Sequence, residues 1–154
     1  MTDVTYTKPT YNDIHNWCLD IIDDIGYSGT NIERVVGISR GGLIPGVIIS
    51  HQLNLPFTAV AYSSKLGNGD NKNHANELPV IKERDILIVD DICDTAHTLN
   101  DVVSHYRSQG HNVTSAVLHY KRRANGIFKP DVCCVVVPED SEWIVYPFEK
   151  VDML

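Results

Sequence analysis

The sequence predicts an α/β fold in which helices cover both faces of a parallel β-sheet. Short apolar runs alternate with segments of helical periodicity, and parallel strands need such crossover connections. Residues 85–91 form an apolar run closed by acids, which is typical of a strand buried on both faces. The chain has 154 residues without an internal repeat, a low-complexity tract or a Pro/Ser-rich linker. These observations favour one domain over residues 1–154.

The elements can be predicted in order along the chain. A helix is predicted from Tyr11 to Ile25 because its apolar residues recur at spacings of three and four. Thr10 and Asp13 resemble a capping box at its start, and Gly26 is a suitable end. Further helices are predicted over 43–53 and 98–109, and strands over 35–38, 57–62, 85–89, 113–120 and 132–137.

Composition excludes several classes of function. No apolar run approaches the roughly 20 residues of a membrane span, and residues 1–6 lack the pattern of a secretory signal, so we expect a cytoplasmic protein. The net charge of −7 disfavours binding to nucleic acid. The four cysteines have no C-x-x-C spacing, and we interpret them as reduced packing residues.

Polar segments follow three of the predicted strands, at residues 39–42, 90–98 and 121–123. Ligands of open parallel sheets bind at the carboxyl ends of strands, so these segments predict one shared site. Asp90 and Asp91, here termed the acid pair, repel each other unless a cation or hydroxyl donors lie against them. Mg²⁺ and ribose hydroxyls would supply both. Within 121–123, Lys121 is the strongest candidate, since its two arginine neighbours are equally consistent with a solvated basic patch.

Residues 94–98, Asp-Thr-Ala-His-Thr, form a short polar loop that enters a helix. Backbone N–H groups and the positive end of a helix dipole favour a phosphate at such a position, and two threonine hydroxyls add donors. The sequence contains no G-x-x-x-x-G-K-[ST] motif, which argues against a P-loop nucleotidase. The loop from 63 to 78 is polar and has almost nothing to bury, which is typical of a functional or disordered loop.

Residues 86–98 resemble the signature of type I phosphoribosyltransferases that binds 5-phosphoribosyl pyrophosphate (PRPP). Residues 38–46 are similar to the pyrophosphate loop of the xanthine-guanine branch, and residues 143–149 resemble its C-terminal base-binding hood. The resemblance runs from about Val35 to Glu149. It implies a lid loop at about 63–78 and a small hood at about 138–154.

The resemblance also implies roles for single residues. The expected PRPP-binding residues are Ser39, Arg40, Gly41, Asp90, Asp91, Asp94, Thr95, Ala96, His97 and Thr98. The expected base-binding residues are Lys121, Trp143 and Ile144, and the expected metal ligands are Asp90, Asp91 and Glu149. The expected catalytic residues are Asp94 as acid or base at the purine imidazole, Arg40 on the pyrophosphate and Lys121 on the 6-oxo group.

Together these features predict a purine salvage enzyme that uses Mg²⁺. It would transfer 5-phosphoribosyl from PRPP to guanine, xanthine or hypoxanthine and release pyrophosphate and a nucleoside monophosphate. Positive character develops on the ribose during such a displacement, so cations on the leaving group and a shielded site are needed, whereas a covalent nucleophile is not. The resemblance further implies a homodimer or homotetramer with small-molecule partners only.

Two departures from the signature keep alternatives open. Ala96 stands where glycine is usual, and its methyl group could crowd a phosphate or resist a positive φ, so we expect weaker donor binding. A non-catalytic regulator that senses PRPP or a nucleotide is therefore the main alternative. Glu149 stands where the family has aspartate. A phosphoacceptor signalling domain is disfavoured because its acid pair would close the first strand, whereas here the pair closes the third.

Overall fold

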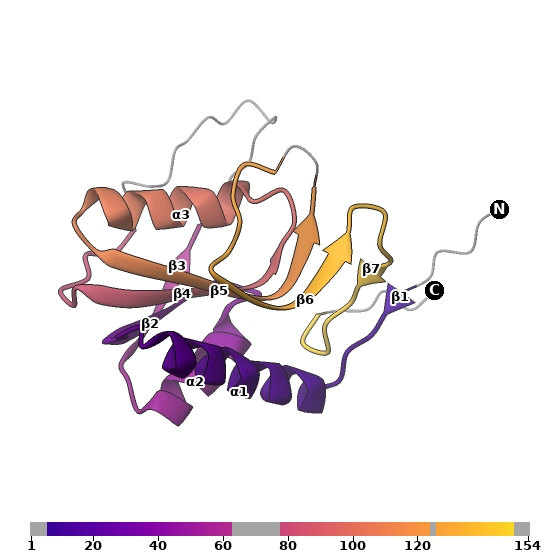
Figure 1. The fold of residues 1–154 in the computed structure, drawn as a ribbon, viewed down its shortest axis with the longest axis horizontal. Coiled ribbons are helices and arrows are strands. Elements are labelled where there is room, and N and C mark those ends of the chain that lie inside the picture. The colour runs from indigo at the N-terminus through magenta and orange to yellow at the C-terminus, as the bar shows by residue number, and fades with distance from the viewer. Residues whose placement is uncertain (1–5, 63–77, 124–125, 150–154) are drawn as a thin grey trace.

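The computed structural model describes residues 6–62, 78–123 and 126–149, and its main feature is a five-stranded parallel sheet (Figure 1). The strands are β2 (Arg34–Ser39), β3 (Phe57–Ala61), β4 (Asp85–Cys93), β5 (Asn112–Arg122) and β6 (Val132–Pro138). Their order is β3-β2-β4-β5-β6, and every neighbouring pair is parallel. The predicted fold class is therefore confirmed, with the long apolar run in the central strand.

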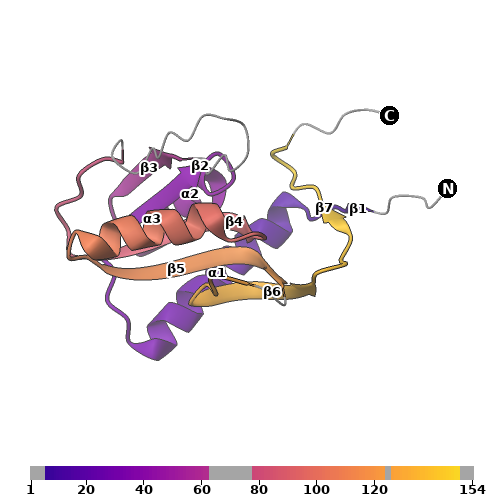
Figure 2. The same ribbon diagram turned by 90° about the horizontal axis from the view of Figure 1, so that it is seen from above.

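Helices cover both faces of this sheet. α3 (His97–Ser108) lies on one face, and α1 (Tyr11–Ser28) and α2 (Leu43–Leu53) lie on the other (Figures 1 and 2). Within β4, Ile86 and Ile88 belong to the core under α3, whereas Leu87 and Val89 belong to the core under α1 and α2. Alternate strand residues point to opposite faces, so a strand covered on both sides must be apolar throughout.

The start of α1 follows the sequence prediction, but its end does not. The backbone N–H of Asp13 donates to Thr10 Oγ1 over 3.1 Å, and the backbone N–H of Thr10 donates to Asp13 Oδ2 over 2.8 Å. The helix continues past Gly26 and ends at Gly29, which has φ 69°. The predicted end at Gly26 is wrong because the left-handed residue that closes the helix is Gly29, whose N–H donates to the Gly26 carbonyl.

A second, two-stranded sheet joins distant parts of the chain and was not predicted. β1 (Tyr6–Thr7) pairs in parallel with β7 (Trp143–Ile144). The N–H of Val145 donates to the Thr7 carbonyl over 2.9 Å, and the Thr7 hydroxyl donates to Glu142 over 2.8 Å. The pair lies beyond the carboxyl end of β6 in both views (Figures 1 and 2). A segment near the N-terminus therefore holds the predicted hood.

Parts of two predicted segments fall outside the described residues. Of the loop predicted over 63–78, residues 63–77 lie outside them, while Leu78 is buried in the core under α3 and is 7% exposed. Of the hood, residues 150–154 lie outside them. No helix among the described residues is long and apolar enough to span a membrane.

Candidate active site

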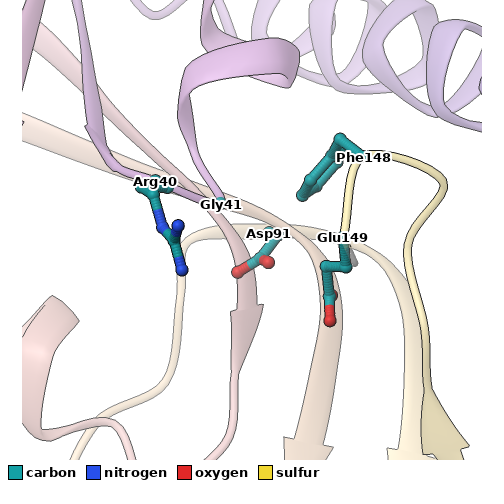
Figure 3. Close-up of a pocket in the computed structure, with 5 residues that line it drawn as sticks. All are labelled: Arg40, Gly41, Asp91, Phe148 and Glu149. Atoms are coloured by element: carbon teal, nitrogen blue, oxygen red, sulfur yellow. The ribbon is translucent and has the colours of Figure 1, made fainter. Parts of the chain in front are cut away.

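Two adjoining cavities lie where the carboxyl ends of the sheet strands meet the hood. The larger measures about 510 Å³ and is lined by Arg40, Gly41, Asp91, Phe148 and Glu149 (Figure 3). The smaller measures about 100 Å³ and is lined by Ile92, Asp94, Lys121, Glu142, Trp143, Ile144, Tyr146 and Glu149. Glu149 lines both cavities. In Figure 3 the side chains of Arg40, Asp91 and Glu149 extend to the same side, with Asp91 between the other two.

The turn after β2, residues 39–42, is pressed against the end of β4. A Cβ atom on Gly41 would overlap the carboxylate of Asp91, and one on Gly42 would overlap the carbonyl oxygen of Val89. The N–H of Gly42 donates to the Ile38 carbonyl over 2.8 Å. Glycine is thus required at 42 by the close approach of backbone to backbone, whereas at 41 a Cβ atom would displace the Asp91 side chain. The turn brings Arg40 into the lining of the larger cavity.

The acid pair lies inside β4 rather than after it, which corrects the predicted strand end. Pairing with β2 ends at Gly37 and Val89, but pairing with β5 continues to Cys93 and Tyr120. Beyond Val89, β4 has no hydrogen-bonded partner on the β2 side. There the carboxylates of the acid pair accept hydrogen bonds from backbone N–H groups of β4 itself. The N–H of Asp91 donates to Asp90 Oδ1 over 2.9 Å. The N–H of Ile92 donates to Asp91 Oδ1 over 2.7 Å.

Burial is the first cause of the raised pKa of both carboxyl groups in the acid pair. The nearby charge of Asp91 raises the pKa of Asp90 further. Ionisation of both groups in a partly buried position is energetically unfavourable unless a partner compensates the charge. A cation or a set of hydroxyl donors against the acid pair would relieve this repulsion.

The threonine turn, residues 95–98, leads from β4 into α3. Ala96 is the residue before the helix and has φ 70° and ψ −1°, so the predicted positive φ is observed. Its side chain is 6% exposed and belongs to the core under α3. The cost of alanine here is therefore a backbone cost, of the order of 1 kcal/mol, with the methyl group itself packed. Thr95, Ala96, His97 and Thr98 lie outside the linings of both cavities.

Asp94 and Lys121 form an ion pair in the smaller cavity, whose lining also carries the carboxylates of Glu142 and Glu149. Lys121 is only 8% exposed, and its Nζ lies 3.9 Å from Asp94 Oδ2. The prediction placed Lys121 after its strand, but it lies inside β5 because β5 pairs with β6 as far as Arg122 and Pro138. Asp94 also binds Arg123, whose Nε donates to Asp94 Oδ1 over 2.7 Å. A buried ammonium group beside a carboxylate is a combined donor and acceptor site.

The hood contributes the remaining wall. Ile144 is buried, whereas Trp143 is 60% exposed at the edge of the smaller cavity. Sequence reasoning missed Tyr146, which is 1% exposed and whose hydroxyl donates to the Asp91 carbonyl over 3.1 Å. The same oxygen lies 2.7 Å from His119 Nδ1, so this nitrogen must carry the hydrogen and donate. Burial lowers the pKa of His119 to about 4, in agreement with a neutral ring.

Other residues missed from the sequence are Phe148, Glu142 and Ile92. Phe148 stacks on Tyr146 with ring centroids 5.4 Å apart. Its position within the hood motif could have indicated a wall residue, but no charge or periodicity marks it. Within the described part of the chain, no three His, Cys, Asp or Glu side chains come together as a metal site. The predicted ligands Asp90, Asp91 and Glu149 therefore do not form a complete site by themselves.

The family described as the phosphoribosyl transferase domain matches residues 2–150. The chain belongs to the phosphoribosyltransferase family. With its parallel sheet and its glycine and acid motifs, it is a type I phosphoribosyltransferase by sequence and fold, near the xanthine-guanine branch.

Relatives of this chain include both adenine and xanthine-guanine phosphoribosyltransferases. An adenine phosphoribosyltransferase from Beijerinckia indica is 29% identical over 103 residues, which cover 58% of this chain and 56% of the relative. A xanthine-guanine phosphoribosyltransferase from Roseobacter denitrificans is 30% identical over 132 residues, which cover 76% of this chain and 68% of the relative. The chain thus spans just over half the length of the adenine relative and about two thirds of the other.

A solved structure carries the same fold. The crystal structure of a hypothetical protein from Neisseria gonorrhoeae with bound ppGpp superposes with a TM-score of 0.77 at 23% identity, covering 99% of this chain and 93% of that chain. At this identity the match supports the phosphoribosyltransferase fold alone.

Proposed function

We propose that this protein transfers the 5-phosphoribosyl group of PRPP to a purine base, and that a 6-oxopurine is the preferred base. The observation that carries the proposal is the buried Lys121 beside Asp94 in a cavity that adjoins the one lined by Arg40 and Asp91. One cavity suits the donor and the other suits a flat base. The relatives include both adenine and xanthine-guanine enzymes, so the family alone leaves the base open.

The donor would occupy the larger cavity. Asp90 and Asp91 would accept hydrogen bonds from the ribose hydroxyls. These donors would stabilise the ionised form of the two carboxyl groups, whose pKa values are raised by burial. Arg40, with Ser39 and Gly41 in its turn, would bind the pyrophosphate. The threonine turn, within which α3 begins, would bind the 5′-phosphate through backbone N–H groups.

The donor set also fits Mg²⁺. The carboxylates of Asp91 and Glu149 line the larger cavity, and Mg²⁺ is usually held by one or two carboxylates together with substrate phosphates. This accounts for the lack of a complete protein-only metal cluster among the described residues. When bound, Mg²⁺ would neutralise charge on the departing pyrophosphate.

The base would occupy the smaller cavity. The Lys121 ammonium can only donate hydrogen bonds, so it favours a 6-oxo group, which accepts, over the 6-amino group of adenine, which donates. Asp94 would accept the proton of the imidazole nitrogen while the other ring nitrogen bonds to C1 of the ribose and the C1–O bond to pyrophosphate breaks. Trp143 would stack on the base, and the backbone of Ile144 would contact its edge.

A regulatory function on the same fold is the second candidate. The Neisseria gonorrhoeae protein of similar fold was solved with ppGpp, a nucleotide, and Ala96 adopts the conformation for which glycine is usual. In this case PRPP or a guanine nucleotide would bind as an effector without turnover. The two candidates differ in whether a nucleoside monophosphate forms.

A panel of bases tests the proposal. The protein is incubated with PRPP and Mg²⁺ and with guanine, xanthine, hypoxanthine or adenine, and nucleoside monophosphate is quantified. We expect turnover of at least one oxopurine, a loss of about 100-fold for Lys121→Ala and Asp94→Asn, and no change for the exposed Lys129→Ala. Tight PRPP binding without product from any base would establish the regulator instead.

The assembly state and location follow from the same proposal. We expect a homodimer or homotetramer in the cytoplasm, with PRPP and purine bases as the only partners. Light scattering of the purified protein would measure the subunit count.

A further inference from the structure

Arg123 holds the carboxylate of Asp94 from a position outside both cavities. Asp94 and Lys121 line the smaller cavity, whereas Arg123 belongs to the lining of neither. Nε of Arg123 donates to Asp94 Oδ1 over 2.7 Å, and its Nη2 contacts the same oxygen. The other carboxylate oxygen, Oδ2, is the one nearest Lys121. The two oxygens of Asp94 thus have different partners.

Arg123 is itself held in place by a second acid. Its Nη1 donates to Glu139 Oε1 over 3.2 Å, and Glu139 directly follows β6. The guanidinium group therefore joins the loop after β4 to the segment that leads into the hood. Its planar fork has fixed geometry, so binding both acids restricts its own orientation.

Strand alternation explains why Arg123 rather than its neighbour reaches the site. Successive strand side chains point to opposite faces, so residues 121 and 123 share a side of β5 and its continuation, and residue 122 faces the other way. Lys121 is buried, Arg122 is exposed and Arg123 is intermediate, with 32% of its side chain exposed. Arg122 is therefore a matched control with the same charge.

We propose that Arg123 is a positioning residue that fixes the carboxylate of Asp94 with Oδ2 directed to the bound base, and this rests on the proposed function of Asp94. The terminal torsion of an aspartate has a broad preference, so a partly exposed carboxylate rotates easily when nothing holds it. Occupation of Oδ1 by two N–H groups removes this freedom. It also leaves Oδ2 as the acceptor for the imidazole N–H of the base.

The test compares Arg123→Gln and Arg123→Ala with Arg122→Gln in steady-state kinetics with PRPP and the best oxopurine. We expect kcat to fall about 10- to 100-fold in the Arg123 variants, with the KM for PRPP nearly unchanged and Arg122→Gln close to wild type. Millimolar guanidinium should restore part of the kcat of Arg123→Ala, which a general loss of folding would not allow. Combined with Asp94→Asn, Arg123→Gln should add no further loss, because both changes remove one function.

Three results would overturn the inference. One is an unchanged or increased kcat in Arg123→Gln; another is an equal loss in Arg122→Gln; the third is a loss in Arg123→Ala that guanidinium does not relieve. In each case the wild-type protein would still turn over a base, so the proposed function would stand. A wild-type protein that turns over no base would instead refute the proposed function and this inference together.

Discussion

Removal of the Tyr146 hydroxyl group should loosen the contact between the hood and the acid pair. In Tyr146→Phe the ring still packs against Phe148, but the N–H of His119 and the carbonyl of Asp91 both lose their partner. Each unpaired buried polar group costs about 1–3 kcal/mol, so we expect the free energy of unfolding to fall by about 2–6 kcal/mol for the two groups. In the proposed reaction this contact would align the base with the ribose, so kcat should fall at least about tenfold.

Tyr106→Phe is the matched control. Tyr106 is as buried as Tyr146, and its hydroxyl donates to the Pro79 carbonyl over 2.8 Å, far from either cavity lining. Pro79 is exposed, so water can replace the lost donor and the expected destabilisation is about 1 kcal/mol. Urea unfolding and steady-state kinetics are measured on both variants at a temperature where both are folded. Equal kcat values for the two would refute the proposed coupling between hood and acid pair.

Three further variants test single features. Gly41→Ala should reduce activity at least about tenfold with a raised KM for PRPP, because its Cβ displaces the Asp91 carboxylate; normal kinetics would contradict the close approach. Ala96→Gly should leave the free energy of unfolding within about 1 kcal/mol of wild type, since relief at φ 70° offsets the lost methyl packing. A larger loss of stability in urea unfolding would count against a backbone cost at this residue. His119→Asn should lessen destabilisation by acid. Between pH 6.5 and 4 the unfolded chain binds a proton at this histidine, whereas the buried ring of the folded protein stays neutral, so the free energy of unfolding should fall by about 3 kcal/mol more in the wild type than in the variant. Urea unfolding at several pH values measures this, and an equal fall in both proteins would refute it.

The sheet and the acid pair were predictable because their signals are local. The run from Ile86 to Val89 and the following acids are contiguous, and the glycines after β2 stand next to one another. Strand ends were less predictable. β4 and β5 continue past the apolar run because neighbouring strands keep pairing there, and this depends on residues far along the chain.

Contacts between distant residues left no signal in the sequence. Tyr146 and His119 are 27 positions apart, and neither spacing nor charge connects them. β1 and β7 have only two residues each, which is too short for a periodic pattern. Arg123 is an instructive intermediate case. Two-residue alternation from Lys121 selects Arg123 over Arg122, but only because β5 extends to Arg122, and the apolar run does not indicate this.

The pairing of Tyr6 and Thr7 with Trp143 and Ile144 sets an order of assembly during synthesis. A ribosome that has released the chain as far as β5 has already made the residues proposed to grip PRPP. The wall proposed to hold the base forms only when residue 144 emerges and meets residues 6 and 7, which were made well before it. A prematurely terminated chain would then retain an incomplete donor site without selectivity for a base. A bulky fusion placed before Tyr6 would interfere with the choice of base before it weakened PRPP binding.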